Sequence, residues 1–187
     1  MTGGDQNIVI RGARWRDVTP ISQFLKLCWH ATNDPILGRE LALRAGRRVY
    51  SRLYLAVMIA QSKLPSYALN LLAARGEDAP VGLAMAQRDG TEIVLYMLYV
   101  HPQWQGRGIG SALMQAVCTA HPDAKAIRLE VLKGNVAAVA WYQAKGFESY
   151  GESAHATGTR DVGSMYMDKQ LQVPSSGAVA APPRPKA

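Results

Sequence analysis

Three glycines at alternate positions, Gly106, Gly108 and Gly110, have the spacing in this chain that points most directly to chemistry. They follow a short apolar segment that ends at His101-Pro102, and they precede an amphipathic stretch that predicts a helix. Glycine lets the backbone approach a ligand closely, and the first turn of a helix presents unpaired N–H groups at the positive end of its dipole. The segment therefore predicts a site for an anion such as a phosphate or pyrophosphate.

Three phosphate-binding patterns compete for this segment. A nucleotide P-loop is excluded because no Gly-Lys-Ser/Thr follows. A dinucleotide loop needs a glycine where Ser111 stands, although Glu130 lies about 20 residues further on, where that fold places an acidic residue. The pattern Gln/Arg-x-x-Gly-x-Gly/Ala fits Gln105 to Gly110 at every position. A glycine-rich turn without a ligand is the fourth interpretation.

The fully matched pattern resembles the acyl-CoA pyrophosphate loop of the GNAT-type N-acetyltransferase superfamily. The resemblance continues through a predicted strand at 128–132 and then through Asn135, Tyr142 and Gly146-Phe147, which frame a short helix as in that family. It is specific from about 95 to 147. It is weaker upstream, where Ile10-Arg11-x-Ala13 with Asp17, and Val81-Gly82, resemble the family's first and third strands.

The resemblance implies a single α/β domain over residues 7–170, with a mixed, mostly antiparallel central sheet of about seven strands flanked by about four helices. It implies transfer of an acetyl group from acetyl-CoA to a primary amine of a small molecule or a protein N-terminus, by direct attack. A non-catalytic acyl-CoA-binding module would share the loop and remains the alternative function.

The resemblance also implies roles for individual residues. Backbone groups of Leu98 and Val100 would pair with the pantetheine arm, and Asn135 would touch it. Tyr142 would protonate the leaving thiolate, because a phenol with a pKa near 10 can donate its proton. The pyrophosphate would be held by the loop residues Gln105, Gly106, Arg107, Gly108, Ile109, Gly110 and Ser111.

The general base is the open question at this site. In the subgroup that acetylates ribosomal-protein N-termini, a glutamate at the place of Glu92 is the base. Simple alternation puts Glu92 on the same strand face as Leu98 and Val100, although a bulge would break that parity. A solvated carboxylate at the strand end, with deprotonation through ordered water, explains Glu92 equally well.

Composition excludes several other classes. No apolar run approaches the roughly 20 residues that a membrane span needs, and the first residues lack the features of a signal peptide. The histidines show no metal-ligand spacing, so we expect neither a metal nor a catalytic histidine. Cys28 and Cys118 lie on predicted apolar helix flanks, which predicts buried, reduced thiols in a cytoplasmic protein and no covalent acyl-enzyme.

The net charge of +7 is concentrated in the first third of the chain, and no nucleic-acid-binding motif accompanies it. A solvated helix face explains this charge, and a wall of the acceptor site is the alternative. In the second case like charges would disfavour a polyamine acceptor. The basic residues gather on one predicted helical segment: Arg39, Arg44, Arg47, Arg48 and Arg52.

Periodicity predicts the order of the remaining elements. Apolar spacing predicts a first helix that ends at Asn33-Asp34-Pro35 and a second helix over 39–62. Residues 50–59 are apolar nearly all round, so we expect a possible homodimer through this segment. Asp89-Gly90 predicts a hairpin turn, and residues 173–187 predict a disordered tail.

Overall fold

A computed structural model of the chain describes residues 8–61, 69–75, 79–153 and 163–171. These residues form a seven-stranded sheet in the order β1-β2-β3-β4-β5-β7-β6. Neighbouring strands are antiparallel except β4 and β5, which are parallel. The strands are β1 (Ile8–Gly12), β2 (Leu69–Arg75), β3 (Ala79–Asp89), β4 (Glu92–Val100), β5 (Ala126–Leu132), β6 (Glu148–Ser153) and β7 (Ser164–Gln170).

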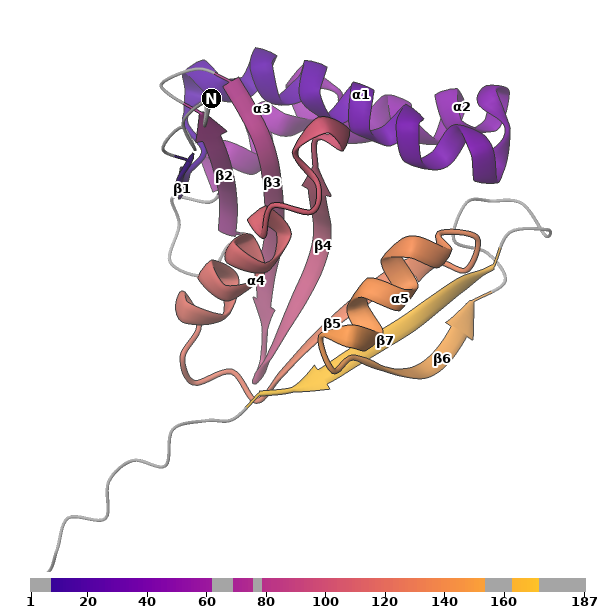
Figure 1. Ribbon diagram of the computed structural model, residues 1–187. Coiled ribbons are helices and arrows are strands. Elements are labelled where there is room, and N and C mark those ends of the chain that lie inside the picture. Colours follow the sequence, from indigo (N-terminus) through magenta and orange to yellow (C-terminus); the bar gives the residue numbers. More distant parts are fainter. Residues whose placement is uncertain (1–7, 62–68, 76–78, 154–162, 172–187) are drawn as a thin grey trace, which may run out of the picture.

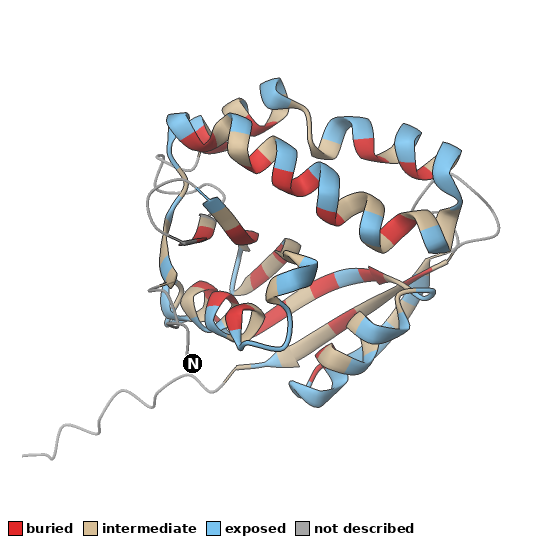
Figure 2. Ribbon diagram, turned by 45° about the horizontal axis from the view of Figure 1, so that its top comes forward, coloured by how far each residue is buried: buried red, intermediate tan, exposed pale blue. Residues whose placement is uncertain are grey.

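Helices cover both faces of this sheet. One hydrophobic cluster joins α1 and α3 to β2 and β3, and a second joins α4 and α5 to the other face (Figure 1). The helices turn their buried residues inward and their exposed residues to solvent, as the alternation of buried and exposed residues along α1 shows (Figure 2). The helices are α1 (Val18–Leu37), α2 (Arg39–Val49), α3 (Arg52–Gln61), α4 (Ile109–Thr119) and α5 (Val136–Ala144), with 3₁₀ turns η1 (Trp15–Asp17) and η2 (Pro102–Trp104).

This arrangement confirms the predicted α/β fold with a mixed, mostly antiparallel sheet of seven strands. The described part has five α-helices because the predicted helix over 39–62 is two helices, α2 and α3. Ser22 Oγ donates to the Tyr50 carbonyl (2.5 Å), and Ser51 Oγ accepts from the Tyr54 N–H (3.4 Å) at the start of α3. Ser51 is a sequence signal for a helix start that the apolar run around it obscures.

The predicted break at Asn33-Asp34-Pro35 is wrong, because α1 continues through Pro35 to Leu37. Asn33 Nδ2 donates to the Trp29 carbonyl (2.9 Å), and His30 Nδ1 pairs with Asp34 Oδ1 (2.8 Å). Both contacts join residues four apart and so support the helical turn. Pro35 removes one backbone hydrogen bond close to the helix end, where the loss costs least.

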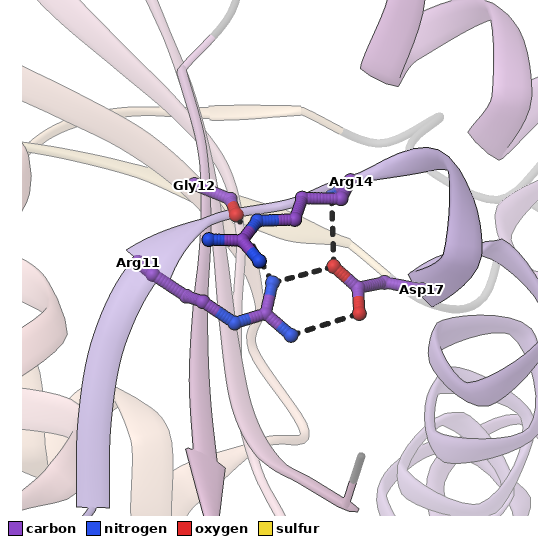
Figure 3. Close-up of polar contacts among 4 residues, drawn as sticks. All are labelled: Arg11, Gly12, Arg14 and Asp17. Atoms are coloured by element: carbon purple, nitrogen blue, oxygen red, sulfur yellow. Dashed lines mark hydrogen bonds and ion pairs between the residues drawn. The ribbon is translucent and has the colours of Figure 1, made fainter. Parts of the chain in front are cut away.

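The junction between β1 and α1 is fixed by one buried carboxylate (Figure 3). Asp17 is only 3% exposed, and its two oxygens accept from the two terminal nitrogens of Arg11 at 2.6 and 2.8 Å. The backbone N–H of Arg14 donates to the same carboxylate (2.7 Å). The hydrogen bond from Arg11 is the main reason that the pKa of Asp17 lies below its usual value.

The predicted hairpin turn at Asp89-Gly90 is confirmed: β3 ends at Asp89, Gly90 has φ +57°, and β4 begins at Glu92. Along this hairpin the register shifts once, since Met85 pairs with Met97 and Ala86 pairs with Leu95. Tyr96 is therefore an extra residue on β4, a β-bulge that reverses the alternation of side chains.

The sheet divides between its two parallel strands. Pairing of β4 with β5 starts at Glu92 and ends at Leu95 and Leu129, after which the strands diverge (Figure 1). Beyond Leu95, β4 is bonded to β3, as in the pairs Leu98–Ala84 and Val100–Gly82. The edge of β4 that faces β5 therefore offers backbone groups to an added extended chain.

Four further expectations concern the tail, the domain bounds, membrane spans and the two cysteines. The predicted tail, 173–187, lies outside the described residues, and the domain bounds 7–170 stay a prediction. No described helix is both long and apolar enough to cross a membrane. Cys28 is buried and Cys118 is partly buried, and both are free thiols; burial raises the pKa of Cys28 to about 12.

Candidate functional site

The glycine loop lies between the end of β4 and the start of α4. Gly106 and Gly108 have φ of +74° and +79°, and a Cβ at either position would meet no atom within 4 Å. Glycine is thus required by the backbone conformation, and the space beside it is open. Gly108 is the N-cap of α4, and its carbonyl accepts the Ala112 N–H (2.9 Å). The free N–H groups of the first turn consequently point to the open side of the loop.

Three side-chain contacts hold this loop in place. Gln105 Nε2 donates to the Val100 carbonyl (3.3 Å), and His101 Nδ1 accepts from the Gln103 N–H (3.2 Å). The Arg107 guanidinium lies 4.7 Å from the Trp104 ring centroid, so its side chain packs on the loop itself.

Close packing of α4 on the sheet fixes the direction in which the loop opens. A Cβ at Gly82 would lie 2.9 Å from both Ile109 Cγ2 and Leu113 Cδ1, so the helix sits directly on β3 at this glycine. Ile109 and Leu113 are buried. The start of α4 is therefore held rigidly at the end of β4 where the strands have diverged.

A cavity of about 570 Å³ extends from the loop along the diverged strand and ends at α5. It brings together residues that lie far apart in the sequence, and it includes nearly all of the predicted cofactor site; the side chain of Arg107 packs outside it. The predicted residues that line it are Leu98, Val100, Gln105, Gly106, Gly108, Ile109, Gly110, Ser111, Asn135 and Tyr142.

The two predicted residues on α5 lie at the inner end of this cavity. Asn135 is the N-cap of α5, and its Oδ1 accepts from the Ala138 N–H (3.2 Å). Tyr142 is 9% exposed and makes edge contacts with Trp141 and Phe147. Burial, and next the neighbouring Tyr99, raise the pKa of the Tyr142 phenol well above its usual value. Gly146, with φ +84°, ends the helix and allows Phe147 to pack beneath it.

Glu92 lies at the opposite end of β4 from the loop, and its carboxylate pairs with Arg128 Nη1 at 3.1 Å. The prediction that Glu92 shares a face with Leu98 and Val100 is wrong, because the bulge at Tyr96 reverses the alternation. Leu98 and Val100 pack with the α4 cluster, as Ile93 and Leu95 do. Glu92 is therefore on the face that carries Met97, Tyr99 and, in β5, Arg128.

On that face a second cavity, of about 580 Å³, opens between α1 and the diverged strands. It shares Leu98, Tyr99, Asn135 and Tyr142 with the first cavity, so a molecule in either one reaches Tyr142. Burial raises the pKa of Tyr99 to about 12, although a hydrogen bond with the Asn33 side chain acts in the other direction.

Sequence reasoning did not single out several residues of this second cavity. Tyr99 stands between the two predicted pantetheine-binding residues, and its position in the wall depends on the bulge. Tyr166 reaches this wall because β7 pairs with the distant β5, and Tyr150 reaches it because β6 pairs with β7. The sequence indicates a role for Glu130 only in the dinucleotide pattern, although in the fold Glu130 directly follows Leu129, the last residue of β5 that pairs with β4.

No histidine of the described residues lines either cavity. His101 caps η2, His30 pairs with Asp34, and His155 lies outside the described residues. Among the described residues no cluster of three or more histidine, cysteine, aspartate or glutamate side chains could hold a metal ion.

Comparisons with known proteins support the resemblance. Residues 68–149 match the family model described as an acetyltransferase (GNAT) domain. The chain has the fold of the PaiA N-acetyltransferase from Thermoplasma acidophilum, solved in complex with coenzyme A, with 21% identity, TM-score 0.77, and 88% of this chain and 99% of that chain covered. A comparison with curated proteins gave no match.

Two further solved structures share this fold at low identity. The ribosomal-protein-S18-alanine N-acetyltransferase from Escherichia coli is 19% identical, with a TM-score of 0.67 and coverage of 92% of this chain and 99% of that chain. A GCN5-related N-acetyltransferase from Rhodopseudomonas palustris is 18% identical, with a TM-score of 0.70 and coverage of 88% and 96%.

Proposed function

We propose that this chain, whose residues 68–149 match an acetyltransferase (GNAT) domain, is an acetyl-CoA-dependent acyltransferase that acetylates a primary amine by direct attack on the thioester. The acceptor is a small molecule or a protein N-terminus. The observation that carries the proposal is the continuous cavity from the glycine loop to Tyr142, along the edge of β4 that has left β5. A cytoplasmic location, where Cys28 and Cys118 stay reduced, is part of the same proposal.

Cofactor binding would use mainly the backbone. The N–H groups from Gly106 to Ser111 would hold the pyrophosphate at the start of α4, where the helix dipole favours negative charge. The pantetheine arm would pair with Leu98 and Val100 as an added strand, with Asn135 beside it. The thioester would then lie next to Tyr142, at the point that the two cavities share.

Starting from an ammonium, the reaction removes two protons from the nitrogen and supplies one to the sulfur. The neutral amine attacks the thioester carbonyl carbon, the C–N bond forms and the C–S bond breaks. The departing thiolate takes the phenolic proton of Tyr142. The second proton of the nitrogen leaves as the amide forms and returns Tyr142 to its neutral state. Burial raises the pKa of the leaving thiol just as it raises the pKa of the Tyr142 phenol. Proton transfer from the phenol to the thiolate is therefore feasible in this cavity. The first proton of the acceptor ammonium leaves through water, and Glu92, which pairs with the cavity-lining Arg128, is the side-chain candidate for the base.

A panel of amines tests the proposal, with release of free thiol from acetyl-CoA as the measurement. Thiol release should require both an amine and the protein, and acetylated product should form in equal amount. A protein that binds acetyl-CoA but releases no thiol with any amine would be the non-catalytic acyl-CoA-binding module.

A further inference from the structure

The second cavity has a wall that the proposed reaction does not use. Its inner end is Tyr142, where the acceptor amine would react, and its outer part is formed by β5, β6 and β7. Side chains alternate between the two faces of these strands. On β5, Leu129 points into the buried core, and Arg128 and Glu130 lie on the opposite face, toward the cavity. An acceptor longer than its reactive amine must lie against this face.

This face has an excess of negative charge in a basic protein. The guanidinium of Arg128 pairs with the carboxylates of Asp89 and Glu92. Within the described residues, Glu130 has neither a hydrogen bond nor an ion pair, and it lines the cavity. Two carboxylates thus pair with the guanidinium, and Glu130 adds a third negative charge without a counter-ion among the described residues, although the whole chain carries a net charge of +7. The local charge favours a cation.

Two tyrosines stand beside Glu130. Tyr166 of β7 is its direct cross-strand neighbour, and the Tyr150 ring stacks on Tyr166 with centroids 6.0 Å apart and planes 25° from parallel. The register shift between Ser149 and Gly151 places Tyr150 at a bulge in β6. Both rings line the cavity. The face of an aromatic ring attracts a cation within about 6 Å, so the rings and the carboxylate recognise the same kind of group.

A buried hydroxyl in the same wall also lacks a partner. Ser164 is 1% exposed and lines the cavity, and its Oγ has no hydrogen-bond partner among the described residues. A buried polar atom without a partner destabilises the fold, and a bound polar group or water restores the missing hydrogen bond. This second observation, independent of the charges, indicates that the wall is built for a polar ligand.

We infer that the acceptor is a cationic amine with two charged ends: one nitrogen reacts at Tyr142, and a second, distal cation binds Glu130 beside Tyr150 and Tyr166. The inference rests on the proposed function and specifies its substrate class. The expectation that basic side chains would disfavour such an acceptor depended on arginines of α2 forming the wall. In the structure that wall is formed by α1 instead, through Trp29, Thr32 and Asn33. Arg48 of α2 lies over the Tyr54 ring, away from the cavity lining.

Three amines of equal length test the inference: 1,4-diaminobutane, butylamine and 4-aminobutanoate. Their distal ends are positive, neutral and negative, while the reacting amine is the same. We expect kcat/KM to fall in that order, with the diamine at least about tenfold above butylamine, as a charge-assisted contact provides. A preference for butylamine or for 4-aminobutanoate would overturn the inference.

The Glu130→Gln variant locates the effect. It should bring the ratio of diamine to butylamine close to one while leaving butylamine and the KM for acetyl-CoA within about twofold, since only the distal contact is lost. The matched control is Glu148→Gln, which removes the same charge from another exposed strand position, on β6, that does not line the cavity. An equal effect of both substitutions would reject a specific contact at Glu130, and so would a loss of butylamine activity in Glu130→Gln.

The same assay separates this inference from the proposed function. Transfer to butylamine without a charge preference rejects the distal cation site and keeps the acetyltransferase. Transfer to other amines but to none of these three also rejects the inference. Failure with every amine, while acetyl-CoA still raises the melting temperature, rejects the proposed function and the inference together.

Discussion

Tyr99 of β4 and Tyr142 of α5 line the same two cavities, and a charge on Tyr99 would oppose ionisation of Tyr142. Burial is the main cause that raises the pKa of both phenols, to about 12 for Tyr99 and further for Tyr142. Both are therefore protonated throughout the pH range of ordinary assays. Tyr142 can thus act as a proton donor and not as the general base.

Removal of the Tyr142 hydroxyl tests that role. Tyr142→Phe keeps the ring packed against Trp141 and Phe147, so the fold should be preserved. General acid catalysis contributes roughly 10²–10⁴-fold, and we expect kcat to fall by at least about tenfold with little change in acetyl-CoA binding. Steady-state kinetics and titration of the cofactor measure the two quantities separately.

Tyr99→Phe is the matched control, because it deletes a hydroxyl from the same cavities. We expect it to change kcat by less than about threefold. If Tyr99→Phe lost the activity and Tyr142→Phe kept it, the acid would be Tyr99. If Tyr142→Phe weakened acetyl-CoA binding at unchanged kcat, Tyr142 would be a binding residue.

The elements around the cofactor cavity could be predicted because their signals are local. Asn135 and Gly146 bound α5 by capping chemistry, and Gly106 to Gly110 open α4 by backbone freedom. Each signal acts within a few residues, so the sequence contains all of it. The family resemblance implies only that Leu98 and Val100 are free to pair with pantetheine; that the parallel pairing ends at Leu95 and Leu129 is known from the structure, since no local pattern encodes a divergence between strands.

What could not be predicted depends on contacts between distant segments. The bulge at Tyr96 moves Glu92 to the other face of the strand, and nothing near Tyr96 in the sequence signals it. The wall with Glu130 forms only when β7 pairs with β5 and β6 pairs with β7. The continuation of α1 through Pro35 is a different case, because the contacts that support it join residues only four apart and outweigh a local breaker.

Glu92→Gln tests the base. If Glu92 accepts the ammonium proton, kcat/KM should fall by about tenfold or more near neutral pH, and the loss should shrink as pH rises and the amine loses its proton unaided. A pH profile from neutral to alkaline conditions measures this. Asp89→Asn is the control, because Asp89 is the other carboxylate partner of Arg128. Equal losses in both variants, constant with pH, would assign Glu92 to holding Arg128.

Gly108→Asp tests the loop. The substitution adds a side chain and a negative charge at the start of α4, in the open space where the pyrophosphate would lie. Acetyl-CoA should raise the melting temperature of the wild type, because a ligand of the folded state stabilises it, and should no longer do so in this variant.

Gly90→Asp is the control for the strained backbone. Gly90 also has positive φ and open space around it, but it lies in the β3–β4 turn. This variant should lose stability and keep the full shift with acetyl-CoA. A full shift in Gly108→Asp would exclude the loop from the cofactor site.

The predicted homodimer can be tested at the exposed apolar side chains of α3. Leu53 is 77% exposed and Val57 is 46% exposed, while Leu55 and Ile59 are buried on the other side. We expect a dimer that buries the exposed pair, and Leu53→Glu should give monomers. Light scattering measures the mass: a value of 20.3 kDa for the wild type across micromolar concentrations would exclude the dimer.

Asp17 links stability to pH. Its pKa is lowered in the fold, chiefly by the hydrogen bond from Arg11, so its ionised form stabilises the folded protein. This contribution is complete above the unfolded pKa, about 3.8, and is lost as pH falls through the lower folded pKa.

Asp17→Asn should therefore lower the free energy of unfolding at pH 7 by about 2–4 kcal/mol, because it leaves Arg11 without its partner. Urea unfolding of wild type and variant should show this difference shrinking as the pH is lowered below the unfolded pKa. Asp123→Asn is the control, since Asp123 pairs with Arg88 at an exposed site and should change stability little. A difference between wild type and Asp17→Asn that stayed constant into acid would mean that the buried amide is poorly accommodated for reasons of shape and that the charge on Asp17 contributes nothing.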